Sequence, residues 1–194
     1  MQVTDRFHVQ KLALEALQDI RIKHRWDAID LENQEIKNAR LTDQTYKPKL
    51  FSNGDTRKQL LARSRYLLYK APSNWTKNQY ERSQIIFKEY PDIKTAFNLV
   101  QNLRNIFNST KSIEIAYTKL AHWYKEVEQS GFRAFNTIAN TITINYRSIL
   151  NYFVNRSTNA SAESFNAKIK AFRSQFRGVK NVEFFLFRLT TIFA

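Results

Sequence analysis

The sequence predicts a mainly α-helical domain, and three observations support this fold class. Glycine and proline occur only three times each among the 194 residues, too few for a fold built from many tight turns. Apolar residues recur at intervals of three and four over long segments, which is the spacing of one helix face. The chain is also 43% hydrophobic, which is enough for one compact domain with a sizeable core.

The first part of the chain is predicted to form a long helix, a loop and a second helix. The long helix runs from about Phe7 into the thirties, and the three β-favouring residues "QVT" before it are typical of the end of a strand. Residues 42–56 hold Pro48 and an Asn-Gly pair without helical spacing, so a loop is expected there, and the helical pattern resumes over 57–70. The apolar residues of the long helix are Val9, Leu12, Ala13, Ala16, Leu17 and Ile20.

The stretch "WTKNQY" has the chemistry of a helix start. Thr76 can cap the helix, and Gln79 three residues later can complete a capping box. Trp75 and Tyr80 flank this box at the spacing of a hydrophobic staple. Trp75 is therefore interpreted as a packing residue rather than as an aromatic that stacks on a nucleic-acid base.

Three further helices are expected before residue 156. Residues 92–107 and 111–129 show helical spacing, and Gly131 ends the second of these. Residues 132–155 are ambiguous because their Thr and Ile content favours strands, most of all over 137–144, whereas length favours a helix. The apolar positions behind that interpretation are Phe135, Ile138, Ile142, Ile149 and Phe153.

The end of the chain is predicted to form two amphipathic helices separated by Gly178. Apolar residues repeat at three and four residues in both segments. The seam of the first is formed by Ala162, Phe165, Ile169, Phe172 and Phe176. The second carries Val182, Phe185, Leu186, Leu189 and Phe193.

The chain is strongly basic, with 31 Lys and Arg against 17 Asp and Glu and a formal charge of +14. Such an excess favours polyanionic partners such as DNA, RNA or an anionic membrane, although a solvated basic surface explains it too. Without cysteine, disulfides and Cys-based zinc sites are excluded in this stretch. No apolar run approaches the roughly 18 residues that span a bilayer, so a soluble, cytoplasmic protein is expected.

Part of this positive charge falls between residues 33 and 70. The segment contains nine Lys or Arg and three acids. It is the best purely electrostatic candidate for a DNA contact outside the C-terminal run, although a solvated helix face fits the count equally well. The candidate DNA-binding residues here are Lys47, Lys49, Arg57 and Lys58.

Two acids have both structural and functional interpretations. Glu163 stands at the head of the C-terminal run, and all later charges in 164–178 are positive. As a structural residue, an acid in the first turn stabilises a helix by roughly 0.3–1 kcal/mol through the helix dipole. Asp5, just before the long helix, fits an N-cap, but it would also fit a metal ligand at the end of a strand. The cations that follow Glu163 on its helix are Lys168, Lys170, Arg173 and Arg177.

Both acids lie in motifs that resemble a known family. "DRFHVQKLALEAL" followed at long range by "NASAESFNAKIKAFRSQFRG" is similar to the bacterial insertion-sequence transposases of the DDE class, ISL-three type. The resemblance implies that Asp5 is the second acid of the catalytic triad and Glu163 the third. It covers essentially the whole chain, including "RYLLYK" and "LNYF" in a region like the family's helical insertion.

The resemblance implies a fold and a domain organisation. The chain would be mainly α, the C-terminal part of an RNase H-like (integrase-like) α/β catalytic domain with a large helical insertion, and most of the sheet would be missing. Residues 1–32 would hold the end of a strand and the first core helix, 33–155 the insertion, and 156–194 the helices with the catalytic Glu. Without the leading strands, the first helix is expected to expose an apolar face, which would favour instability or self-association.

The resemblance also implies a chemistry. Asp5 and Glu163 would bind Mg²⁺ or Mn²⁺, and two such ions about 3.5–4 Å apart can activate the attacking oxygen and stabilise the leaving one. Lys168, Lys170, Arg173 and Arg177 would hold phosphates that the acids repel. The partners would be transposon-end and target DNA, with a homo-oligomeric parent enzyme, no membrane, and a nucleoid-associated location in a bacterial cytoplasm.

One departure limits this expectation. The family's first catalytic Asp lies upstream of the "DRFHV" motif, which begins here only four residues after Met1. The predicted function is therefore a fragment of a metal-dependent DDE transposase, inactive alone in end cleavage and strand transfer. The alternatives are a non-catalytic basic helical module that binds nucleic acid, and a helical scaffold or membrane-surface protein.

Overall fold

The computed structural model describes residues 6–146 together with Ile149, Phe153 and Ala171. This part of the chain is mainly α-helical, as the sequence predicts, and it contains no β-strand, only an isolated antiparallel bridge between Leu50 and Thr56. The helices are α1 (Arg6–Leu41), α2 (Arg57–Arg63), α3 (Arg65–Tyr69), a 3-10 turn (Pro72–Asn74), α4 (Lys77–Glu89), α5 (Pro91–Ser109), α6 (Ile113–Ser130) and α7 (Arg133–Ile144). An RNase H-like sheet stays a prediction.

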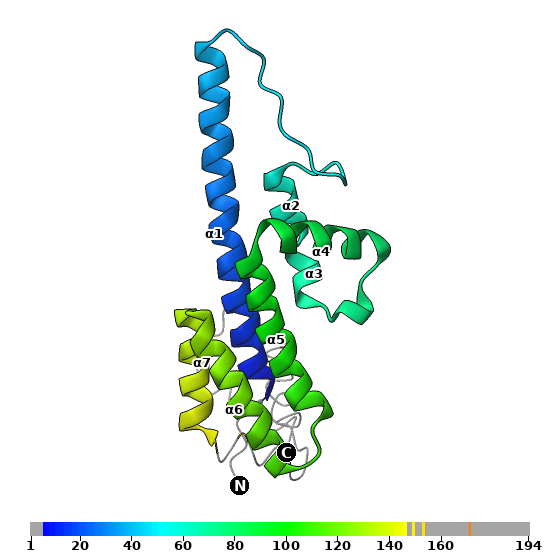
Figure 1. Cartoon of the computed structure of the whole chain (residues 1–194), viewed down its shortest axis with the longest axis vertical. Coiled ribbons are helices and arrows are strands. Elements are labelled where there is room, and N and C mark those ends of the chain that lie inside the picture. The colour runs from blue at the N-terminus through cyan, green and yellow to red at the C-terminus, as the bar shows by residue number, and fades with distance from the viewer. Residues whose placement is uncertain (1–5, 147–148, 150–152, 154–170, 172–194) are drawn as a thin grey trace.

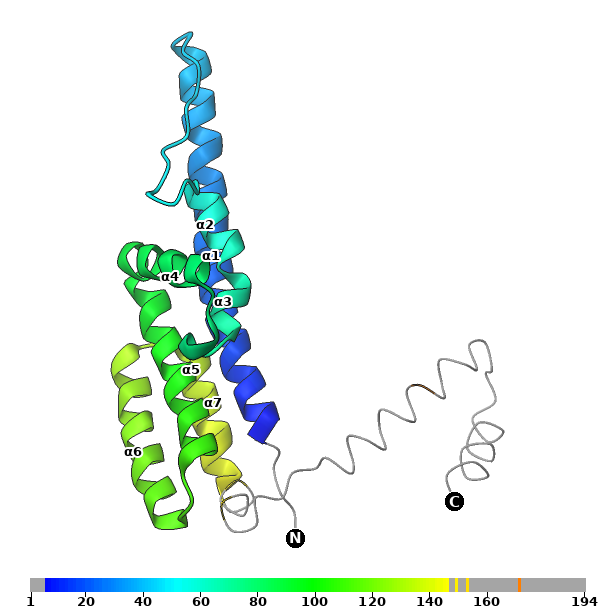
Figure 2. The ribbon, with the colours of Figure 1, turned by 90° about the vertical axis from the view of Figure 1, so that its right-hand side faces the viewer.

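The helices form an elongated bundle beside a smaller group of short helices (Figures 1 and 2). Helices α1, α5, α6 and α7 lie along one another, with α1 packed against α5 and α7, and α6 packed against α5 and α7. Helices α2, α3 and α4 flank α1 and α5. With 36 residues, α1 is about 54 Å long at 1.5 Å per residue, and its C-terminal half extends beyond the bundle.

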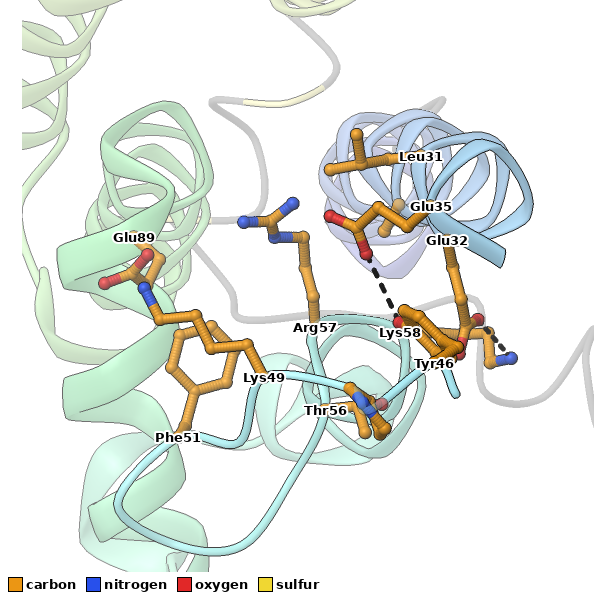
Figure 3. A pocket seen from close by; sticks show the side chains of 12 residues that line it. Leu31, Glu32, Glu35, Tyr46, Lys49, Phe51, Thr56, Arg57, Lys58 and Glu89 are labelled. Atoms are coloured by element: carbon orange, nitrogen blue, oxygen red, sulfur yellow. Dashed lines mark hydrogen bonds and ion pairs between the residues drawn. The ribbon is translucent and has the colours of Figure 1, made fainter. Parts of the chain in front are cut away.

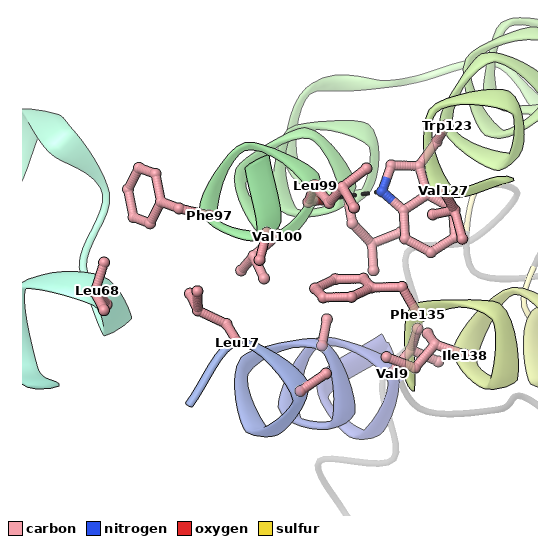
Figure 4. Packing of buried hydrophobic residues seen from close by; sticks show 14 of the residues in the cluster. Val9, Leu17, Leu68, Phe97, Leu99, Val100, Trp123, Val127, Phe135 and Ile138 are labelled. Atoms are coloured by element: carbon pink, nitrogen blue, oxygen red, sulfur yellow. Dashed lines mark hydrogen bonds between the residues drawn. The ribbon is translucent and has the colours of Figure 1, made fainter. Parts of the chain in front are cut away.

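The core lies where α1, α5, α6 and α7 meet, and it continues to buried residues of α2, α3 and α4 (Figure 4). Val9 and Leu17 of α1 are completely buried there, so the expectation of an exposed apolar face is wrong at these positions. The reason is that α5 and α7 cover this face of α1 within the chain. Trp123 of α6 is 1% exposed, and its indole N–H donates to the Leu99 carbonyl oxygen at 2.9 Å, which satisfies its one polar group inside the core.

The predicted loop over 42–56 is confirmed, but the helix expected over 57–70 is divided. The division is at Ser64, which lies between α2 and α3. The buried Ser64 hydroxyl donates to the Leu60 carbonyl oxygen at 2.6 Å, a local bond of the kind that bends helices.

The predicted start of α4 is confirmed. Thr76 is the N-cap, its hydroxyl accepts from the Gln79 N–H at 3.3 Å, and the Gln79 side chain accepts from the Thr76 N–H at 3.2 Å. Trp75 is a packing residue, as expected, but its ring lies against Phe87 and Phe97 at centroid distances of 6.3 and 5.5 Å. Its N–H donates to a backbone carbonyl of α3 at 2.8 Å.

The later predictions hold as far as the described residues extend. Helices α5 and α6 match the expected ranges, and Gly131 ends α6 in the left-handed conformation with φ 69°. The ambiguous segment is helical over α7, including 137–144, and all five apolar positions that predict a helix there are buried. Helix α1 runs without interruption through residues 32 and 33, while the division into three domains stays a prediction. The expected strand end at 2–4 and the seam, Gly178 stop and last helix beyond residue 161 lie outside the described residues.

Candidate nucleic-acid interface

The residues predicted for catalysis lie outside the described part of the chain. These are Asp5 and Glu163. The four cations after Glu163 that are predicted to bind DNA also lie outside it, namely Lys168, Lys170, Arg173 and Arg177. Within the described residues no group of three or more His, Asp or Glu side chains could hold a metal ion. The resemblance implies two carboxylates as metal ligands, and carboxylates provide the hard oxygen atoms that Mg²⁺ prefers. That the two carboxylates come together in the fold stays a prediction.

The other predicted cations lie around a small cleft between α1, the 42–56 loop and the end of α4 (Figure 3). Lys49, Arg57 and Lys58 line it, and Lys47 is exposed on the same loop. The cleft has a volume of about 90 Å³, well below the roughly 300–1,000 Å³ of small-molecule pockets. The cleft is therefore too small for a drug-sized ligand.

Three glutamates face these cations in the cleft. Glu32 forms an ion pair with Lys58, and Glu35 accepts a hydrogen bond from the Tyr46 hydroxyl at 3.3 Å. Glu89 points from α4 into the space that Lys49 and Arg57 also enter (Figure 3). Glu32 and Glu89 come from outside the basic segment 33–70, so the local positive charge is smaller than the count along the sequence suggests. DNA contacts at this cleft stay a prediction.

Asp55 fixes the loop that carries these residues. Its carboxylate is completely buried and accepts hydrogen bonds from Arg63 of α2, from Arg82 Nε of α4 at 2.7 Å and from the Asn53 amide at 2.8 Å. Burial alone would raise the pKa of the Asp55 carboxyl, but the hydrogen bonds from Arg82 and Arg63 outweigh it and hold the pKa below its ordinary value. Asp55 therefore ties the loop to two helices.

The same short stretch starts α2 by local chemistry. Gly54 adopts φ 78°, which residues with a side chain rarely take, and its N–H donates to the Phe51 carbonyl oxygen at 2.9 Å. Thr56 then forms a capping box with Gln59, in which each side chain accepts from the other residue's N–H. The turn and the cap together set where Arg57 and Lys58 begin the helix.

A second group of cations lies where α1 meets α3. Arg65 is one of the Lys and Arg counted in the basic segment 33–70, but Arg21 and Arg25 were not named from the sequence. Arg21 is 5% exposed, and its guanidinium donates to the Gln18 side-chain oxygen at 2.6 Å and to the Leu61 carbonyl oxygen at 2.9 Å. Arg25 lies one turn further along α1, and Arg65 begins α3. The four-residue spacing of Arg21 and Arg25 was the available signal, but the approach of Arg65 depends on the tertiary fold.

Across the helices that the structure describes, none is long and apolar enough to cross a membrane.

Comparison with known proteins supports the resemblance seen in the motifs. The chain is similar to the transposase for insertion sequence element IS1001 of Bordetella parapertussis, with 24% identity over 138 residues. That alignment covers 70% of this chain but 33% of the relative, so the chain matches about a third of the relative's length. No solved structure matches the chain. The family described as Transposase, the DDE type of the ISL-three group, matches residues 1–189, and the chain therefore belongs to this transposase family.

Proposed function

We propose that this chain acts in DNA transposition, as part of a metal-dependent DDE transposase that cleaves transposon ends and joins them to target DNA. The observation that carries the proposal is the family match over residues 1–189, which includes both acidic motifs. The excess of 14 positive charges supports DNA as the partner, because neutralising phosphates provides most of the affinity in such interfaces. A homo-oligomeric parent enzyme and a nucleoid-associated location in the cytoplasm are parts of the same proposal.

Within this proposal each group of residues has a distinct role. Asp5 and Glu163 would hold Mg²⁺ or Mn²⁺ through their carboxylate oxygens. The metal ions, when bound, would supply charge neutralisation at the phosphorus and activation of the attacking oxygen. The cations that follow Glu163 would hold the phosphates on either side of the scissile bond.

Metal binding tests this assignment directly. We expect the 194-residue protein to bind Mn²⁺, which is observed as loss of the free-ion signal in electron paramagnetic resonance. The double variant Asp5→Asn with Glu163→Gln should abolish this binding. The matched control is Asp30→Asn with Glu128→Gln, which removes the same charge from exposed positions on α1 and α6. Equal Mn²⁺ binding by both double variants would contradict the assignment of Asp5 and Glu163.

Catalysis by these 194 residues alone is expected to be absent. The resemblance requires three acids and matches only Asp5 and Glu163 in this sequence. A strand-transfer assay with duplex DNA and Mg²⁺ or Mn²⁺ should therefore give no joined product. Robust joining would show that the matched pair is sufficient or that another residue completes the site.

The competing function is a basic helical module that binds nucleic acid without chemistry, which the net charge alone would support. Such a module would bind DNA with strong salt dependence and would be indifferent to Asp5→Ala or Glu163→Ala. DNA binding that is unchanged by divalent ions and by both substitutions would favour the module over the transposase fragment.

A further inference from the structure

One surface of the described chain collects positive charge without a carboxylate partner. We call it the α1/α3 basic surface and define it by five cations from α1, α3 with its C-terminal cap, and α5. No ion pair joins any of them to an acid among the described residues, whereas Asp55 and Glu32 are paired with cations near the cleft. The five are Arg21, Arg25, Arg65, Lys70 and Arg104.

Hydrogen bonds from side chains to backbone carbonyl oxygens connect the helices that carry these cations. The Gln18 side chain of α1 donates to the Arg65 carbonyl oxygen at 3.5 Å, and the guanidinium of Arg104 donates to the Tyr69 carbonyl oxygen at 2.9 Å. Gln101, one turn before Arg104 on α5, donates to the Lys70 carbonyl oxygen at 3.4 Å. Helix α3, which begins at Arg65 and is capped by Lys70, is thus attached to α1 through Gln18 and to α5 through Gln101 and Arg104.

The charge of Arg21 is not offset where it is buried. Its two hydrogen-bond acceptors are neutral oxygens. Burial, and then the charges of Arg25 on the same helix and Arg65 on α3, lower the pKa of Arg21, because both cations lie near its guanidinium. An arginine stays protonated even so, and the fold therefore keeps a positive potential at this surface.

The outer members of the surface are accessible. Arg25, Arg65 and Lys70 are exposed, and the Arg65 guanidinium lies 5.5 Å from the ring centre of Tyr66, which is 67% exposed. An exposed aromatic ring beside an arginine offers both stacking and phosphate contacts to a nucleic acid. Gathering like charges without counter-charges costs stability, and a polyanion removes that cost when it binds.

The geometry points to the α1/α3 basic surface as a contact for the DNA phosphate backbone, made of other residues than those that line the cleft. Arg25 and Arg65 would contact the phosphates directly, and the buried Arg21 would add positive potential without touching them. This inference rests on the proposed function, since it assumes that the chain binds DNA, but it adds the surface at which binding occurs.

Charge neutralisation tests the inference. Arg25→Gln with Arg65→Gln should weaken binding to a fluorescein-labelled duplex of arbitrary sequence by at least about tenfold at 0.1 M salt. The slope of log affinity against log salt, measured between about 50 and 200 mM, should fall by about 0.9 for each phosphate that the variant no longer neutralises. Both side chains are exposed, so the variant should keep its thermal unfolding midpoint close to that of the unchanged protein.

A matched variant separates a local contact from net charge. Lys23→Gln with Lys125→Gln also removes two exposed cations, from another side of α1 and from α6, and should change affinity less than about threefold. Equal decreases in affinity for the two double variants would overturn the inference in favour of net charge alone. Unaffected binding by Arg25→Gln with Arg65→Gln would overturn it outright, whereas no DNA binding by the unchanged protein would overturn the proposed function as well.

Discussion

The cleft and the α1/α3 basic surface both contain several cations, but among the described residues acids form ion pairs with these cations only in the cleft. In the cleft, Lys58 has Glu32 as its partner, and Glu89 enters the same space from α4. At the α1/α3 basic surface, Arg21 and Arg65 lie near other cations, and the hydrogen bonds of Arg21 go to neutral acceptors. The density of Lys and Arg along a sequence therefore does not locate a binding surface. The acids that the fold brings to each group of cations decide how much charge is left.

The largest effect is expected at the acid that organises the cleft region. Asp55→Ala should lower the free energy of unfolding by about 3 kcal/mol, because Arg82 would remain largely buried without its carboxylate. This value is at the lower end of the roughly 3–5 kcal/mol typical of broken buried ion pairs, because the side chain of Arg63 is 54% exposed and can be solvated by water. Urea denaturation measures it. The control Asp30→Ala, exposed on α1, should stay within about 0.5 kcal/mol, and a similarly small change in Asp55→Ala would mean that Asp55 does not organise the cleft.

The pH dependence of stability should follow from the same carboxyl. The folded pKa of Asp55 lies below its unfolded value, so its contribution is fully present above the unfolded pKa of about 3.9 and is lost as the pH falls through the folded pKa. The stability difference between the unchanged protein and Asp55→Asn should therefore be greatest near neutral pH and shrink below about pH 4. Denaturation midpoints measured from pH 7 to pH 3 check this. A difference that grows on acidification would reverse the assigned direction.

An intermediate effect is expected at the cap that starts α2 beside the cleft. Thr56→Ala removes the acceptor of the Gln59 N–H and should cost about 1 kcal/mol of folding free energy, measured by urea denaturation. Thr137→Ala on α7 is the control, because its exposed hydroxyl only bonds back to a carbonyl of its own helix. That substitution should be neutral or slightly stabilising, and equal destabilisation by both would argue against a specific cap.

The smallest effects should have opposite signs in the two regions. Arg25→Gln relieves repulsion between cations four residues apart on α1 and should raise the free energy of unfolding by about 0.3 kcal/mol. Lys58→Gln breaks an ion pair in the cleft and should lower it by about 0.5 kcal/mol. Thermal unfolding at low ionic strength resolves the two effects best, because salt screens both of them. Equal signs would mean that the two regions do not differ as described.

Sequence spacing was sufficient for the elements whose signals are local. The capping box at Thr76 needs only Gln79 three residues away, and the end of α6 at Gly131 needs only a residue that tolerates positive φ. Helix α7 was correctly assigned because its apolar positions follow the helical period despite their β-branched neighbours.

Contacts across long separations were not predictable in the same way. Trp75 packs on Phe87 and Phe97 because α4 and α5 fold against each other, which no spacing near Trp75 reveals. The partner of Asp55 in α4, Arg82, is 27 residues away. For the site, the motif resemblance named Asp5 and Glu163. The sequence alone does not show that acids lie beside the cations of the cleft, or that cations of α1 lie near α3.

The length of α1 sets a scale for any nucleic acid that follows it. A straight duplex beside a rod of about 54 Å would cover about 16 base pairs at 3.4 Å each, or roughly one and a half helical turns. Asp5 is bonded to the first residue of this rod, Arg6, and the loop beyond Leu41 starts at its other end. The phosphates of such a duplex at the two ends of α1 would lie on opposite sides of the double helix, so a nuclease-protection footprint of this length on bound DNA would show that the duplex follows α1, and a shorter one that the duplex crosses it.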